Sequence, residues 1–171
     1  MKAATPEELA APTGAGRVPT LTAHATQQLA LLSWPASRLG EALELLARRA
    51  GLHPRAVQGL VPPASAGISL VQTDRWLEWA AGQLDIELEA VDSPVPELGA
   101  LLDNAGPALL RWTDSAGVTG FLLLPGGRRG VGRGVTLLAP DLCIRRCERE
   151  TLRQALCWSL DRLGPLCRSV A

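Results

Sequence analysis

Apolar residues recur at helical spacing in several stretches of the chain. Within residues 37–50, Leu39, Leu43, Leu46 and Ala50 fall at relative positions 0, 4, 7 and 11, which places them on one face of a helix. The same kind of spacing predicts four other helices: a short one after Thr26 within 21–32, and further helices over 69–84, 97–104 and 149–163.

The period changes to two in the middle of the chain. Ile86, Leu88 and Ala90 alternate with Glu87 and Glu89, which is typical of a half-exposed strand. Short apolar runs between turn residues predict four more strands over 108–112, 119–124, 134–138 and 142–147. Helices first, then an antiparallel meander and a last helix, indicate an α+β fold, and we expect the face formed by the leucines of 37–50 to pack on that sheet.

The chain length and local composition predict one domain with two short ends. A chain of 171 residues fits a single domain. Residues 1–22 are rich in Ala, Pro, Thr and Gly, so we expect a disordered lead-in there. We expect the single domain to cover 23–165 and a tail to cover 166–171.

Charge and hydropathy exclude several classes of protein. Lysine plus arginine and aspartate plus glutamate both number 17, which argues against a protein that coats nucleic acid or an anionic membrane. No apolar run reaches the roughly 18 residues that a membrane span requires, so direct membrane insertion is not expected. The N-terminus carries no basic-then-apolar signal pattern, which indicates a cytoplasmic protein.

The residues that usually carry catalysis or bind metal are scarce. Histidine occurs only as His24 and His53. The cysteines form no CxxC pair and have no histidine nearby, so reduced thiols are expected rather than a zinc site; they are Cys143, Cys147, Cys157 and Cys167. We expect no cofactor and no metal ion.

Two local features each have two interpretations. The glycine- and arginine-rich stretch 125–134 is either an anion-binding loop or a β-hairpin turn, and it lacks the Lys-Ser/Thr and following helix of a nucleotide-binding loop. Trp76 and Trp79 lie one helical turn apart, and they either stack on a ligand or cover the edge of the core.

Several segments match, in serial order, those of a known family. Gln28 precedes Trp34 by six residues, and a long helix follows. The further matching segments are Gly67-Ile68-Ser69-Leu70, Pro107-Ala108-Leu109-Leu110-Arg111-Trp112, Gly120-Phe121 and Ala139-Pro140. Over residues 26–160 the chain resembles the papain-like leader-peptidase domain at the N-terminus of bacteriocin- and peptide-exporting ABC transporters.

The resemblance implies a papain-like fold without catalysis. It places Gln28 at the glutamine that supports the oxyanion hole, Trp34 at the cysteine nucleophile, Gly120 at the histidine base and Ala139 at the orienting acid. A thiol protease needs a thiolate, a proton acceptor and a group that orients it, so the resemblance implies an inactive peptidase-like domain.

The resemblance also implies partners and a binding surface. They are a peptide or protein cargo and the transmembrane and ATPase regions of an exporter, at the cytoplasmic face of the bacterial inner membrane. The candidate peptide-binding residues are Trp34, Trp112 and Phe121, in a cleft floored by Trp34 and Gly120. In the opposing interpretation, Trp34 collapses into this cleft and closes it.

Two further functions stay open at the level of the sequence. The first is an unrelated α+β domain that binds a small ligand or an anion through 125–134. The second is an oligomerising scaffold without a ligand.

Overall fold

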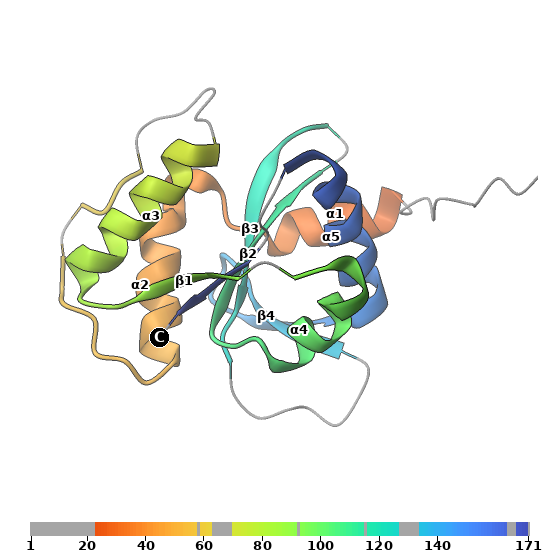
Figure 1. Cartoon of the computed structure of the whole chain (residues 1–171). Helices are drawn as coiled ribbons and strands as arrows, with labels where there is room; N and C mark the ends of the chain where they lie inside the picture. The colour runs from red at the N-terminus through yellow and green to blue at the C-terminus, as the bar shows by residue number, and fades with distance from the viewer. Residues whose placement is uncertain are drawn as a thin grey trace, which may run out of the picture.

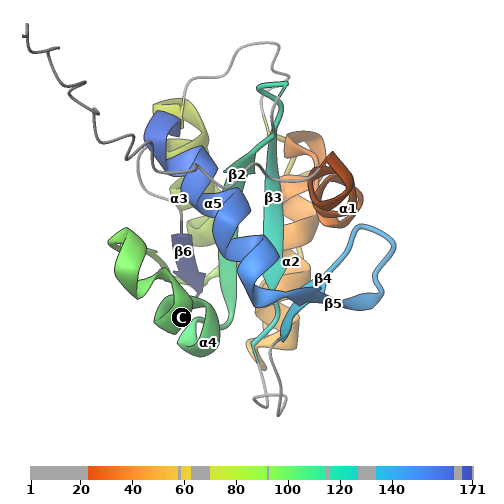
Figure 2. The same cartoon turned by 90° about the vertical axis from the view of Figure 1, so that its right-hand side faces the viewer.

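One antiparallel sheet with helices on both faces forms the centre of the molecule (Figure 1). The structure is a computed structural model that describes residues 23–57, 59–62, 70–91, 93–114, 116–126, 134–163 and 167–170. Helices α2 and α3 cover one face of the sheet, and α1, α4 and α5 lie on the other (Figures 1 and 2). The α+β fold expected from the order of periodic segments is confirmed.

The helices lie where the apolar spacing predicts them. They are α1 (Ala23–Leu32), α2 (Leu39–Arg49), α3 (Leu70–Leu84), α4 (Leu98–Asn104) and α5 (Arg149–Leu163), with 3-10 turns at Ala36–Arg38 and Val95–Glu97. The predicted helix over 37–50 thus begins as a 3-10 turn. Ser69, predicted to open α3, lies outside the described residues.

The sheet contains the predicted meander and two further strands beside it. Its strands are β1 (Leu88–Val91), β2 (Ala108–Thr113), β3 (Thr119–Leu124), β4 (Gly134–Leu138), β5 (Ile144–Glu148) and β6 (Cys167–Val170). Their order is β1-β6-β2-β3-β4-β5, and every neighbouring pair is antiparallel. In the central pair, Trp112 lies opposite Gly120 and Arg111 lies opposite Phe121.

The expectation of a tail over 166–171 is wrong for Cys167–Val170. These residues form β6, which pairs with β1 on one side and with β2 on the other. Four residues are too few to show a reliable alternation of apolar and polar side chains, so the pattern gave no strand signal there. The predicted lead-in over 1–22 lies outside the described residues.

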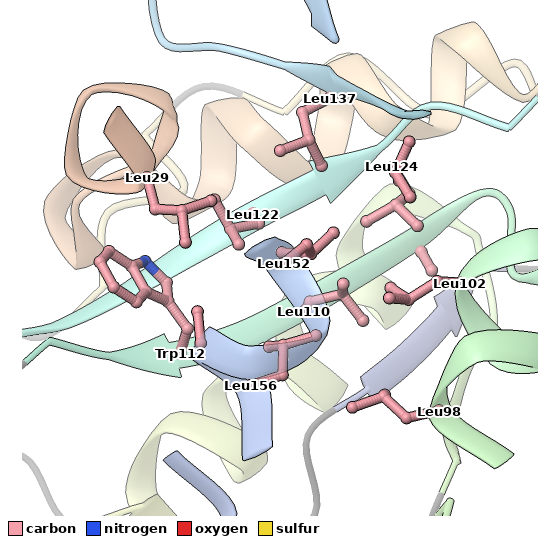
Figure 3. Packing of buried hydrophobic residues seen from close by; sticks show 13 residues of the cluster. Leu29, Leu98, Leu102, Leu110, Trp112, Leu122, Leu124, Leu137, Leu152 and Leu156 are labelled. Atoms are coloured by element: carbon pink, nitrogen blue, oxygen red, sulfur yellow. The ribbon is translucent and has the colours of Figure 1, made fainter. Parts of the chain in front are cut away.

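Each face of the sheet has its own apolar core. Because side chains alternate along a strand, Trp112 and Leu122 point to the side of α1 and α5, while Phe121 and Leu123 point to the side of α2 and α3. Figure 3 shows the first core, in which Trp112 lies near Leu29 of α1. The second core contains the predicted helical face: Leu39, Leu43 and Leu46. Its packing on the sheet is confirmed.

Candidate functional site

Trp34 lies in the short connection between α1 and α2 and joins it to the sheet. Its backbone N–H donates to the carbonyl oxygen of Phe121 at 2.7 Å, and its carbonyl oxygen accepts from the N–H of Phe121 at 3.0 Å. This isolated antiparallel bridge lies beside β3, of which Phe121 is the third residue. The start of the long helix α2 is therefore held close to the beginning of β3.

The indole of Trp34 is completely buried. Its exposed fraction is 0%, and its Nε1 donates a hydrogen bond of 2.8 Å to the carbonyl oxygen of Leu138. The guanidinium carbon of Arg38 lies 4.8 Å from the ring centroid, within the range of a cation–π contact. Arg38 also donates to the carbonyl oxygen of Pro140 at 3.2 Å. The expected exposed floor of a cleft at Trp34 is therefore wrong, and the ring fills that space instead.

Gly120, Ser33 and Trp112 form a tight polar contact at the start of β3. Nε1 of Trp112 donates to the hydroxyl of Ser33 at 2.8 Å. A Cβ at Gly120 would overlap the Ser33 hydroxyl oxygen and would lie 3.1 Å from Nε1 of Trp112. Glycine is therefore the residue that fits opposite Trp112 while Ser33 keeps its hydrogen bond.

Ala139 follows Leu138 directly at the end of β4. Its side chain is buried, and its N–H donates to the carbonyl oxygen of Cys143 at 3.0 Å in the turn toward β5. Since Leu138 accepts the indole hydrogen bond, Ala139 lies in the chain immediately beyond the contact of Trp34. Trp34 is thus hydrogen-bonded to Phe121, which follows Gly120 in the sequence, and to Leu138, which precedes Ala139.

The side chains at these three positions have no acid–base or nucleophilic chemistry. They supply an indole, a hydrogen atom and a methyl group. Ser33 is the adjacent hydroxyl, and it already accepts from Trp112. A serine acts as a nucleophile only when a base removes its proton, and neither glycine nor alanine can do so. The arrangement offers space and hydrogen bonds rather than a reaction.

A pocket of about 520 Å³ opens beside this contact. Residues from the α1–α2 connection, the loop before α3 and the turn between β2 and β3 line it: Ala30, Ser33, Trp34, Pro35, Ala36, Ser37, Val61, Pro62, Trp112, Asp114, Val118, Thr119 and Gly120. Val61 and Val118 are 68% and 64% exposed, which is unusual for aliphatic side chains of this size. Trp34 is part of the pocket lining, but its buried ring offers no exposed surface there.

The other candidate residues do not form the exposed binding surface that the resemblance implies. Gln28 is exposed on α1 and does not line the pocket. Phe121 is buried on the opposite face of the sheet, so its assignment to the peptide-binding surface is wrong. Trp112 lines the pocket, but only 3% of it is exposed, so it contributes through its hydrogen bond to Ser33 rather than as an open platform.

The two features with alternative interpretations have separate outcomes. Trp76 is buried in the core beneath α3, and Trp79 is 53% exposed one turn further on, so the pair straddles the rim of the core. The glycine- and arginine-rich stretch falls mostly on residues 127–133, which lie outside the described residues.

Cysteines and histidines of the described residues form no cluster. Cys143, Cys147 and Cys157 are reduced thiols, and burial, with a smaller contribution from Glu148, raises the pKa of Cys147. Within the described ranges, no three His, Cys, Asp or Glu side chains come together in a way that could hold a metal ion. No helix in the same part of the chain combines the length and the apolar character needed to cross a bilayer.

The pocket contains residues that the sequence did not single out. Asp114 accepts hydrogen bonds from the N–H groups of Ala116 and Val118 through one carboxylate oxygen, which is an Asx turn. An aspartate three residues before Gly117 in a polar turn is a recognisable signal for such a turn. Val61 and Val118 lie in loops, where no periodicity marks them.

Comparison with known proteins adds no relative. Neither the protein-family models nor the curated protein sequences give a match to this chain. The functional argument therefore rests on the buried Trp34, on the contact between Gly120 and Ser33, and on the pocket beside them.

Proposed function

We propose that this chain is a non-catalytic, papain-like peptidase domain of a bacterial ABC export system that binds or positions a peptide cargo. One observation carries the proposal: Trp34, which the resemblance places at the nucleophile, is hydrogen-bonded to the sequence neighbours of the other two positions. These neighbours are Phe121, beside Gly120, and Leu138, beside Ala139. An accidental match of short segments has no reason to bring these three positions to one point of the fold.

The arrangement of elements supports the same proposal. In a papain-like peptidase the nucleophile precedes a long helix that packs on an antiparallel sheet, and the base lies on that sheet. Here Trp34 precedes α2, α2 packs on β3, and Gly120 lies at the start of β3. The orienting position, Ala139, comes directly after β4, the strand next to β3.

The loss of catalysis follows from the side chains. Trp34 fills the space of a nucleophile with a buried ring, and Gly120 leaves no side chain to accept a proton. Catalytic groups of such a site act as a unit, so a single restored residue is not expected to give activity. Trp34→Cys alone would lack a base, and Gly120→His alone would overlap Ser33.

The binding role rests on the pocket. It adjoins the degenerate positions, and Val61 and Val118 present aliphatic surface at its lining. An exposed apolar surface beside a concave site is typical of ligand or peptide binding. Micromolar affinity, or about −8 kcal/mol, would be sufficient for the transient capture of a cargo.

The proposal is tested with the purified chain and a synthetic fluorescent peptide that carries a double-glycine leader. We expect mass spectrometry to show intact peptide after long incubation, and fluorescence anisotropy to show micromolar binding. Val118→Asp should weaken binding, whereas Val71→Asp, on an exposed position of α3 outside the pocket, should not. Cleavage that alkylation of thiols abolishes would disprove the non-catalytic role, and absence of binding would disprove the cargo role.

The link to an exporter has its own test. We expect the gene of this chain, or a gene beside it, to encode a six-helix membrane region and an ATPase of the Walker type. Affinity purification of that membrane protein should retain this chain. A genomic neighbourhood without any transporter would contradict this part of the proposal and leave the peptide-binding part to the anisotropy measurement.

A further inference from the structure

We infer that the pocket selects peptides in which a lysine or arginine side chain adjoins small or aliphatic residues. This inference rests on the proposed function, since it specifies the cargo that the same pocket would hold. Its basis is the combination of one carboxylate, one hydroxyl and two exposed valines around a cavity of about 520 Å³.

Asp114 supplies the charge. Among the described residues that line the pocket, it alone carries a formal charge. Its Oδ1 accepts from the N–H of Ala116 at 2.9 Å and from the N–H of Val118 at 2.8 Å, which fixes the orientation of the carboxylate. Among the described residues, no arginine forms an ion pair with Asp114. Oδ2 can therefore accept from a cation that a ligand brings.

Ser33 supplies a directed hydrogen bond within the pocket. Its oxygen accepts from Nε1 of Trp112 at 2.8 Å, which leaves the hydroxyl proton for another acceptor. The missing side chain at Gly120 leaves room for this hydroxyl, and both residues line the pocket. A backbone carbonyl of an extended peptide is an acceptor of suitable size. Ser33 thus adds polar recognition that does not depend on the peptide's sequence.

Val61 and Val118 supply the apolar part. Both line the pocket and both are mostly exposed, although burying such aliphatic side chains is favourable. Val118 is also one of the two residues whose N–H groups hold Asp114, so the apolar and the charged contacts come from the same turn. A cationic residue beside an aliphatic one would meet both contacts together.

The test uses three N-acetylated, fluorescein-labelled decapeptides composed of alanine and valine around one central residue. The central residue is lysine, glutamine or glutamate, and acetylation ensures that the side chain is the only cation. We expect the full chain to bind the lysine peptide about two- to fivefold more tightly than the glutamine peptide, which is the range of a solvent-accessible ion pair. The glutamate peptide should bind most weakly, and added salt should reduce the differences.

Asp114→Asn is the decisive variant because the asparagine oxygen can still accept from both N–H groups of the turn. It should remove the preference for lysine without unfolding the chain, as circular dichroism would check. Asp141→Asn is the matched control: Asp141 also accepts a turn N–H, from Cys143 at 3.0 Å, but it does not line the pocket. This control should keep the lysine preference.

The outcomes separate this inference from the proposed function. Equal binding of all three peptides, or a lysine preference that survives Asp114→Asn, would overturn the cationic specificity while the peptide-binding role stands. Failure of these three peptides and of the double-glycine leader peptide to bind would overturn the peptide-binding role itself, and the specificity with it.

Discussion

The indole Nε1 of Trp34 donates a 2.8 Å hydrogen bond to the carbonyl oxygen of Leu138, so the connection before α2 is fastened to the end of β4. The backbone of Trp34 is paired at the same time with Phe121 of β3. One residue therefore holds the start of a helix against two neighbouring strands. Trp34 therefore has a structural role in this chain.

Trp34→Phe should lower the free energy of unfolding by about 1–3 kcal/mol. Phenylalanine retains most of the buried ring but cannot donate, so the carbonyl of Leu138 loses a partner in a dry environment. Urea denaturation followed by circular dichroism measures the effect. Trp79→Phe, at an exposed position of α3, should change stability by no more than about 0.5 kcal/mol. Equal effects of the two substitutions would show that the hydrogen bond contributes nothing.

Leu43→Ala should lower the free energy of unfolding by roughly 2–5 kcal/mol. Leu43 is fully buried between α2 and the sheet, and the shorter side chain would leave a cavity that rigid neighbours cannot fill. Thermal and chemical unfolding both report the loss. Leu31→Ala on the exposed side of α1 is the control and should be nearly neutral. A neutral Leu43→Ala would mean that α2 does not pack on β3.

Gly120→Ala should destabilise the chain by about 1–3 kcal/mol because the added methyl group overlaps the Ser33 hydroxyl. Gly82→Ala is the contrasting control, since a Cβ there meets nothing within 4 Å on helix α3 and should stabilise it by roughly 0.5–1 kcal/mol. Combining Gly120→Ala with Ser33→Ala should recover part of the loss. Additive destabilisation in the double variant would contradict the proposed overlap.

A chain that ends at Leu166 should lose the protection of β1 in amide hydrogen exchange. Strand β6 lies between β1 and β2, so its removal leaves the N–H and carbonyl groups of Leu88–Val91 without the sheet partners that β6 provides. Unpaired edges also promote aggregation. The amides of β5, at the other edge of the sheet, should exchange more nearly as in the full chain. Unchanged protection of Leu88–Val91 would refute the pairing with β6.

Glu150 should make the stability of the chain depend on pH in the acid range. Hydrogen bonds from Arg153 and then from Gln154 lower its pKa to about 2, below the ordinary value of 4.5. Because the folded pKa is the lower one, the contribution is present above pH 4.5 and is lost as the pH falls toward 2. Glu150→Gln should flatten urea midpoints over this range. An unchanged slope would show that the contacts of Glu150 do not persist in solution.

The helices and the meander could be predicted because their apolar residues repeat at the spacing that places them on the buried face of a helix or strand. The leucines of α2 and the alternation near β1 are such cases. Strand β6 could not be predicted, since its four residues gain their strand conformation from pairing with two neighbours that lie far away in the sequence.

Only part of the candidate site could be predicted from the sequence. The pocket adjoins Trp34 and Gly120, but the sequence could not show that Trp34 is buried, because burial depends on the packing of several elements rather than on local spacing. Phe121 is an example. Alternation along the strand puts its side chain on the other face of the sheet from Gly120 and Leu122, but the sequence pattern does not show which face carries the pocket. Asp114 had a turn signal, whereas Val61 had none.

The close approach of Gly120 to Ser33 also constrains how the chain can change by mutation. A side chain at 120 and a hydroxyl at 33 compete for the same volume, so a side chain at 120 fits without strain only when the Ser33 hydroxyl is displaced or removed. A variant without the Ser33 hydroxyl lacks the acceptor of Trp112. Laboratory evolution toward hydrolysis would therefore need libraries that randomise residues 33, 34 and 120 together, because a change at one of these positions alone lowers the stability of the chain.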